Sequence, residues 1–143
     1  MEQTDIQALL TKAQELAMQG SEAEALKLYF EAASLGSPDG MFEAAEALFW
    51  GRGCPENPGL AADWYTKAAN AGHIGAATSL GISLLYGDGV PRDIERARRY
   101  LEMGADAGDE EAEDALDALE EEEAARAARA ALKAKKAAKK RQG

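Results

Sequence analysis

A turn signal that recurs at a fixed spacing constrains this chain more than any other feature. The segments LFWGRGCPEN, residues 48–57, and LLYGDGVPRD, residues 84–93, each place two glycines and a proline after an apolar run. The equivalent residues are 36 positions apart: Gly51 and Gly87, Gly53 and Gly89, Pro55 and Pro91. Self-similarity with a period of this length is typical of repeat proteins, whose units bury their apolar faces against one another. We therefore expect a stack of related units.

Each unit is predicted to form two antiparallel helices, because large apolar residues recur at steps of three and four positions. Ser21 and Glu24 match a capping box at one helix start. Asn57 and Asp93 are expected to cap two others. Three glycines are expected to end the second helices of the units: Gly36, Gly72 and Gly108. The expected helices cover residues 6–18, 22–35, 39–50, 58–71, 75–86, 93–107 and 109 onward.

The period divides the chain into a repeat domain, expected over 1–123, and a basic tail rich in alanine and lysine, expected over 124–143. The expected parts of the domain are a first unit at 1–37, two further units at 38–73 and 74–108, and a capping helix at 109–123. The predicted fold class is all-α: an α-solenoid of antiparallel helix pairs with a long C-terminal helix.

The third unit, LGISLLYGDGVPRDIERARRYLEMGADAG, resembles a Sel1-like repeat. The residues that carry the resemblance are Leu80, Gly81, Leu84, Gly87, Gly89, Val90, Asp93, Ala97, Tyr100, Ala105 and Gly108. The second unit matches the same pattern but has Cys54 in place of valine and Asn57 in place of aspartate. The first unit is more similar to a tetratricopeptide repeat, through Ala25 and Tyr29 among others. The resemblance implies an all-helical superhelix that scaffolds other proteins.

Composition narrows the class of protein further. The net charge of −10 argues against a body that wraps nucleic acid, because such binding depends on neutralising phosphates. The start, MEQTDIQALLTK, lacks the basic and apolar segments of a signal peptide, and no apolar run approaches the length of a membrane span. Cys54 is the only cysteine, which suits a reducing compartment. We therefore expect a cytoplasmic protein without a membrane span.

Residues for catalysis are not grouped in any recognisable way. His73 is the only histidine, so sites that need several histidines are impossible, and its place after Gly72 predicts a turn or capping residue. Cys54 is interpreted as a small, buried, apolar residue, since no local motif makes it a nucleophile. We expect no catalytic residues, no metal site and no cofactor, and thus a protein that is not an enzyme.

A groove for a partner is predicted beside the core face of the helix at 39–50. Met41, Ala44, Ala45 and Leu48 form the expected core stripe, which leaves Phe42, Glu46 and Phe49 on the neighbouring face. Two interpretations of the phenylalanines stay open: anchors for a partner on a concave surface, or packing against adjacent helices. The full set of predicted groove residues is Asp39, Phe42, Glu46, Phe49, Thr78, Ile82 and Leu85.

The last part of the chain separates its charges. Residues 109–123 hold ten acids and no base, whereas residues 124–143 hold eight bases and no acid. Apolar residues at 112–119 are expected to cap the last repeat, and nothing beyond Glu123 is expected to dock on it. In a helix, four bases would form one stripe: Arg129, Lys133, Lys136 and Lys140. This tail is either a solubilising segment, with or without pairing to the acids before it, or a contact for nucleic acid or an acidic surface.

These observations predict a non-catalytic adaptor that binds a peptide or helix of an unidentified partner protein in its concave groove. The alternative is an accessory module tethered to nucleic acid or an acidic surface through its basic tail.

Overall fold

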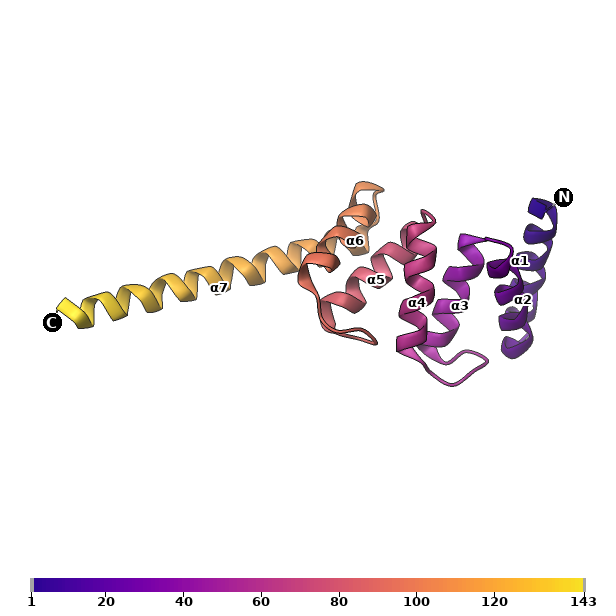
Figure 1. Cartoon of the computed structure of the whole chain (residues 1–143), viewed down its shortest axis with the longest axis horizontal. Helices are drawn as coiled ribbons and strands as arrows, with labels where there is room; N and C mark the ends of the chain where they lie inside the picture. Colours follow the sequence, from indigo (N-terminus) through magenta and orange to yellow (C-terminus); the bar gives the residue numbers. More distant parts are fainter. Residues whose placement is uncertain (1, 143) are drawn as a thin grey trace.

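The computed structural model describes residues 2–142, and these residues form helices joined by short turns, with no strand among them (Figure 1). The seven helices of this part are α1 (Glu2–Met18), α2 (Glu22–Ser34), α3 (Pro38–Trp50), α4 (Pro58–Asn70), α5 (Ile74–Tyr86), α6 (Ile94–Asp106) and α7 (Glu110–Gln142). The predicted all-α class is confirmed, with α1 beginning at Glu2 rather than at residue 6.

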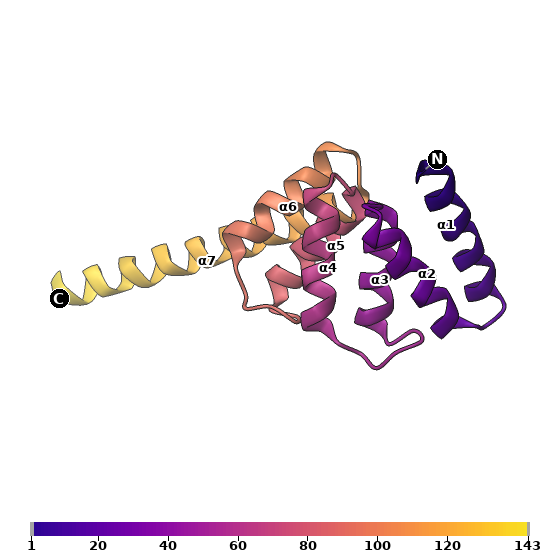
Figure 2. The same ribbon diagram turned by 45° about the vertical axis from the view of Figure 1, so that its right-hand side comes forward.

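Consecutive helices pack against each other along the chain, so that α1 to α6 form a row of antiparallel pairs (Figures 1 and 2). Buried alanines let the helices approach closely: Ala25, Ala61 and Ala97, at equivalent places in the three pairs, are at most 2 % exposed. Larger side chains fill the space that remains, and Leu80, Leu84 and Leu101 are the largest that are fully buried. The interior is therefore a chain of pairwise contacts, as expected for a solenoid.

Polar side chains start several of the helices. Asn57 Oδ1 accepts a hydrogen bond from the Leu60 amide at 3.1 Å, and Asp93 Oδ1 accepts one from the Arg96 amide at 3.1 Å. Both caps were predicted, and each satisfies a backbone donor that has no partner within its helix.

The capping box predicted at Ser21 and Glu24 is wrong. The Ser21 side chain makes no capping hydrogen bond, although Ser21 does precede α2. Its backbone N–H donates instead to the Leu16 carbonyl at 2.8 Å, which closes the turn after α1. The amide that the Glu24 carboxylate would have accepted from is thus already used.

The repeated glycines end the first helices and hold the linkers in place. Gly51 and Gly87 have φ values of 73° and 70°, in the left-handed region, and they end α3 and α5. A Cβ at Gly53 would lie 2.6 Å from the Ala23 nitrogen at the start of α2. A Cβ at Gly89 would overlap Pro58 at the start of α4. Each linker therefore lies against the second helix of the preceding pair, where no side chain fits.

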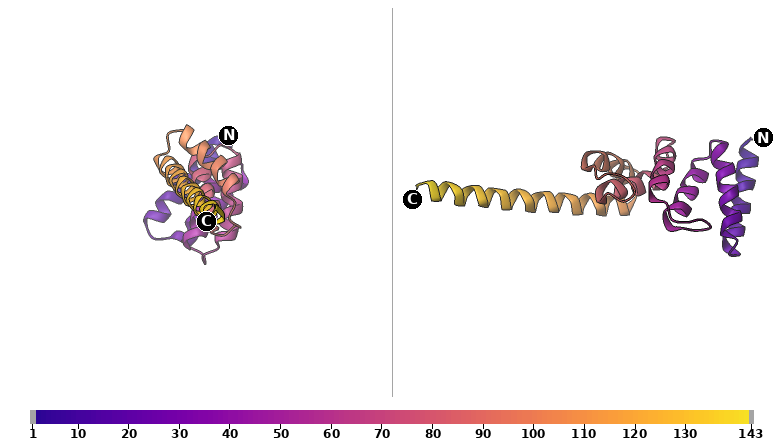
Figure 3. Two further views of the ribbon diagram at one scale, coloured as in Figure 1. Left: turned by 90° about the vertical axis from the view of Figure 1, so that its left-hand side faces the viewer. Right: turned by 60° about the horizontal axis from the view of Figure 1, so that its bottom comes forward.

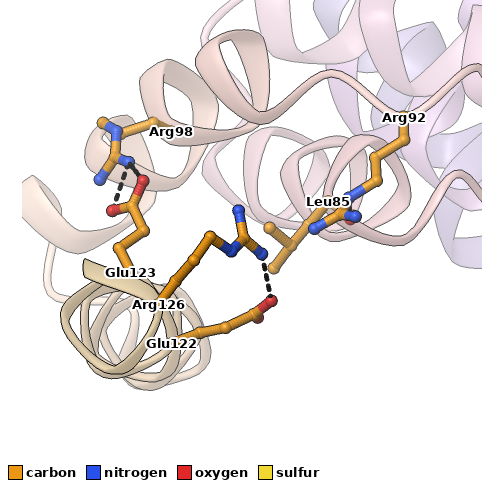
Figure 4. Close-up of polar contacts among 6 residues, drawn as sticks. All are labelled: Leu85, Arg92, Arg98, Glu122, Glu123 and Arg126. Atoms are coloured by element: carbon orange, nitrogen blue, oxygen red, sulfur yellow. Dashed lines mark hydrogen bonds and ion pairs between the residues drawn. The ribbon is translucent and has the colours of Figure 1, made fainter. Parts of the chain in front are cut away.

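Helix α7 closes the stack and then leaves it. Its first part packs on α6 and α5, where Ala112 and Leu119 are buried. Arg98 of α6 donates to both carboxylate oxygens of Glu123 at 2.8 Å (Figure 4). Beyond this contact the helix continues straight and leads away from the other helices, with all of residues 124–142 exposed (Figures 1 and 3).

Candidate functional site

An open groove of ≈ 390 Å³ lies between α3 and α5 and is bordered by the turn after α5 and the start of α7. The buried stripe of α3, which includes Ala44, Ala45 and Leu48, packs into the core and turns the neighbouring face of the helix toward the groove. The residues that line it are Phe42, Glu46, Phe49, Trp50, Tyr65, Gly75, Ser79, Ile82, Ser83, Tyr86, Asp88, Asp109 and Glu111.

Aromatic rings of α3 line the groove. Phe42 stacks on His73 with 4.4 Å between ring centroids, and Phe49 meets Trp50 edge to face at 4.9 Å. Both phenylalanines are half-buried and also pack against the core. The two interpretations of these residues are therefore not exclusive: each ring rests on the core and still lines the groove.

Two further aromatic residues extend the aromatic lining into solvent, one at the end of α3 and one at the end of α5. Trp50 is 56 % exposed and Tyr86 is 71 % exposed, although both are large and largely apolar. They occupy equivalent places, 36 positions apart, as the last residues of α3 and α5. The groove prediction missed them, and the signal that could have found them is an aromatic residue at the end of a helix, where little covers it.

Carboxylates also line the groove, from α3, from the turn after α5 and from the start of α7. Glu46 Oε1 accepts a hydrogen bond from the Tyr65 hydroxyl at 2.7 Å, and Asp109 Oδ2 accepts one from the Thr78 hydroxyl at 2.7 Å. Burial, together with the bond to Glu46, raises the pKa of the Tyr65 phenol, so this donor keeps its proton. Asp88 and Glu111 complete the set and are exposed.

The groove is therefore negatively charged as well as aromatic. None of the lining residues in the described part of the chain is lysine, arginine or histidine. Four carboxylates beside exposed rings suit a cationic side chain, which both the acids and the faces of the rings attract.

The structure brings together Phe42, Glu46, Phe49 and Ile82 from the predicted set of groove residues. Thr78 and Leu85 do not lie in the groove. They are 2 % and 5 % exposed, so the prediction that they line the groove is wrong. Thr78 is covered because its hydroxyl bonds to Asp109 beside α7, and Leu85 is covered because it packs in the main core. Asp39 is exposed but lies outside the groove, 3.2 Å from His73 Nε2.

His73 and Cys54 have structural surroundings. His73 Nδ1 accepts a hydrogen bond from the Ala76 amide at 3.0 Å, which makes it the predicted cap of α5. The Cys54 thiol is half-buried between the two core clusters and donates to the Ala47 carbonyl at 3.5 Å. Among the side chains that the structure describes, no group of three or more His, Cys, Asp or Glu residues could hold a metal ion.

The four cations of the tail stripe lie on the helical end of α7, and their role as a contact stays a prediction. Arg129, Lys133, Lys136 and Lys140 are all exposed on α7. Arg126, one turn earlier, pairs with Glu122 at 2.9 Å, while the bond to Glu123 raises the pKa of the Arg98 guanidinium (Figure 4).

Within the described residues, no helix is long and apolar enough to cross a membrane.

The row of antiparallel helix pairs defines an α-solenoid repeat protein. The family model of the Sel1 repeat matches this chain at residues 17–37, 38–73 and 74–109. The chain therefore belongs to the Sel1 repeat family. The resemblance seen in the second and third units is thus confirmed, and a match also covers the second half of the first unit.

Several known proteins are similar to this chain in sequence or in fold. The chain is 35 % identical over 94 residues, 64 % of its length, to chitin synthase regulatory factor 2 of Schizosaccharomyces pombe, of which it spans 18 %. A Sel1 repeat protein from Oxalobacter formigenes has a TM-score of 0.66 and 33 % identity over 68 % of this chain and 28 % of its own. Helicobacter pylori cysteine rich protein B has a TM-score of 0.66 at 20 % identity, over 77 % of this chain and 87 % of its own, which shows the fold alone.

Proposed function

We propose that this chain is a non-catalytic adaptor that binds a segment of a partner protein in the groove between α3 and α5. Sel1 repeat proteins generally mediate protein–protein interactions, and the family is typically non-catalytic. The observation that carries the proposal is the exposure of Trp50 and Tyr86 beside the half-buried Phe42 and Phe49. Exposed aromatic side chains gathered in a concavity are characteristic anchors for a partner.

The similarity to a regulatory factor supports an adaptor, since that protein is named for regulation of a synthase. The chain spans less than a third of that relative and of the Oxalobacter protein, so it corresponds to a module within them. We propose the same division here: residues 1–123 act as the binding module and residues 124–143 as a separate tail. A cytoplasmic location stays a prediction from the sequence.

The test is affinity capture with the full chain, comparing Trp50→Ala/Tyr86→Ala with the unchanged protein. Tyr86 is 71 % exposed, so its removal is expected to change the free energy of unfolding by no more than about 0.5 kcal/mol, whereas removal of Trp50 also breaks its contact with Phe49 and is expected to cost about 0.5–1.5 kcal/mol. Quantitative mass spectrometry is expected to show one set of proteins lost with this variant.

The matched control is Met18→Ala/Leu60→Ala, which also removes two exposed apolar side chains, 88 % and 41 % exposed, outside the groove. This control is expected to retain the captured proteins. Equal capture by both variants would show that the groove is not the binding surface.

A further inference from the structure

The charges of the chain are separated between its body and its tail. All 26 acids precede residue 124, and eight of the 16 lysines and arginines follow Glu123. The net charge of −10 is therefore the sum of −18 on residues 1–123 and +8 on residues 124–143. Opposite charges of this size attract each other when two copies meet.

The tail has few partners within its own chain. Residues 124–142 are the exposed end of α7, and these 19 residues extend for about 28 Å at about 1.5 Å per residue. Within the described residues, the one ion pair made by a cation of this segment joins Arg126 to Glu122. The other seven cations of the tail therefore have no ion pair there.

The tail cannot reach the groove of its own chain while α7 is helical. Asp109 and Glu111 border the groove at the first end of α7, and the tail is the opposite end of the same straight helix (Figure 3). The groove of another copy has no such restriction.

The groove and the tail have complementary chemistry. The groove offers the carboxylates of Glu46, Asp88, Asp109 and Glu111 and the exposed rings of Trp50 and Tyr86, with no lining cation. The tail offers lysines and arginines on a helix whose other residues are mostly alanine, so its backbone can approach a shallow groove closely. Charge-assisted hydrogen bonds and contacts between cations and rings would form together.

We propose that the groove receives the basic tail, residues 124–142, of a second copy of this chain. The proposal rests on the proposed function, because it uses the same groove as a binding surface. Each copy offers one groove and one tail, so the contact is heterologous. Such contacts form rings if the rotation closes and open chains of molecules if it does not.

The test is sedimentation velocity of the full chain over a concentration series at low and at high salt. At low salt the mass is expected to rise with concentration above that of a monomer, to a closed ring of two or more copies or to longer chains, and added salt is expected to reverse the rise. Deletion of residues 124–143 is expected to leave a monomer.

Charge-reversal variants test whether the tail binds the carboxylates of the groove or other acidic residues of the chain. Asp88→Lys/Glu111→Lys changes two exposed carboxylates of the groove that hold no hydrogen bond to Tyr65 or Thr78. This variant is expected to weaken self-association by at least about tenfold, because it places like charges together. The control, Glu56→Lys/Glu95→Lys, makes the same change of charge in another linker and another first helical turn, outside the groove, and is expected to associate normally.

A charge swap completes the test. Lys133→Glu/Lys136→Glu/Lys140→Glu is expected to abolish self-association, and mixing this variant with the reversed groove is expected to restore it between the two. A wild-type chain that stays monomeric at low salt overturns the proposal, as does association that survives reversal of the groove. A monomer whose tail binds duplex DNA also overturns it and favours the nucleic-acid tether. A monomer that still captures partners through Trp50 and Tyr86 overturns this proposal alone and leaves the proposed function standing.

Discussion

Gly104, near the end of α6, faces α5 and α7 at a place where neither helix leaves room for a side chain. A Cβ at this position would overlap the Thr78 hydroxyl of α5 and lie 2.7 Å from the Ala112 Cβ of α7. Ala112 cannot turn aside because its Cβ is fixed to the backbone, and the Thr78 hydroxyl is held by its bond to Asp109. Gly104→Ala must therefore push α7 away from the stack.

The size of the effect follows from three contributions. Overpacking in a filled interior costs about 1–3 kcal/mol. Loss of the bond from Thr78 to the Asp109 carboxylate costs about 1.5–3 kcal/mol. Alanine in place of glycine within a helix gains back about 1 kcal/mol. The free energy of unfolding is thus expected to fall by about 1.5–5 kcal/mol.

The measurement is urea unfolding followed by circular dichroism, with amide hydrogen exchange to locate the loss. Amides of α7 up to Glu123 are expected to exchange faster in Gly104→Ala, and those of α1 and α2 to stay unchanged, since repeats interact mainly with their neighbours. The control is Gly59→Ala, also within a helix, where the nearest atom to an added Cβ is 3.6 Å away. It is expected to be neutral or more stable by up to about 1 kcal/mol. Equal stability of the two variants would refute the argument.

Two other substitutions test the interior and its electrostatics. Leu101→Ala removes a side chain that is 0 % exposed, and urea unfolding is expected to show a loss of about 3–5 kcal/mol; a loss below about 1 kcal/mol would contradict its burial. Burial, followed by the nearby charges of Glu46 and Asp39, raises the pKa of the Glu43 carboxyl above its ordinary value of 4.5. The folded state therefore binds the Glu43 proton more tightly than the unfolded state does. This protonation adds to the free energy of unfolding in full below the pKa of the unfolded state, and the contribution is lost as the pH rises through the pKa of the folded state. Glu43→Gln is expected to reduce the decrease in the free energy of unfolding with rising pH and to be more stable than wild type at neutral pH, as measured by urea unfolding. An unchanged pH profile would show that other groups cause the decrease.

Helix positions could be predicted from the sequence because their signals are local. The left-handed glycines Gly51 and Gly87 and the caps at Asn57 and Asp93 act within a few residues of themselves. The capping box at Ser21 could not be judged in this way. Its outcome depended on a hydrogen bond to Leu16 across the turn, which competes for the same amide.

The groove was predicted only where one helix defines it. The helical period of α3 identified Phe42, Glu46 and Phe49. On α5 the period alone could not separate Ile82, which lines the groove, from Thr78, which does not. The difference is made by the side chains that cover α5, above all the Asp109 carboxylate beside α7. The acids at Asp88, Asp109 and Glu111 come from a turn and a later helix, so only the folded chain brings them to α3.

The linker glycines Gly53 and Gly89 lie at the joints between neighbouring helix pairs, outside the residues that line the groove. Gly89 lies backbone to backbone against Pro58, which joins the pair that contains α3 to the pair that contains α5. A methyl group added at Gly89 would push against Pro58 at one side of this contact and would change the angle between the two helix pairs. The distance between the aromatic ends of α3 and α5 would then change, although neither Trp50 nor Tyr86 had been altered. A substitution at Gly89 can therefore change the width of the groove, and so the size of the partner segment that fits, while every residue that lines the groove stays the same.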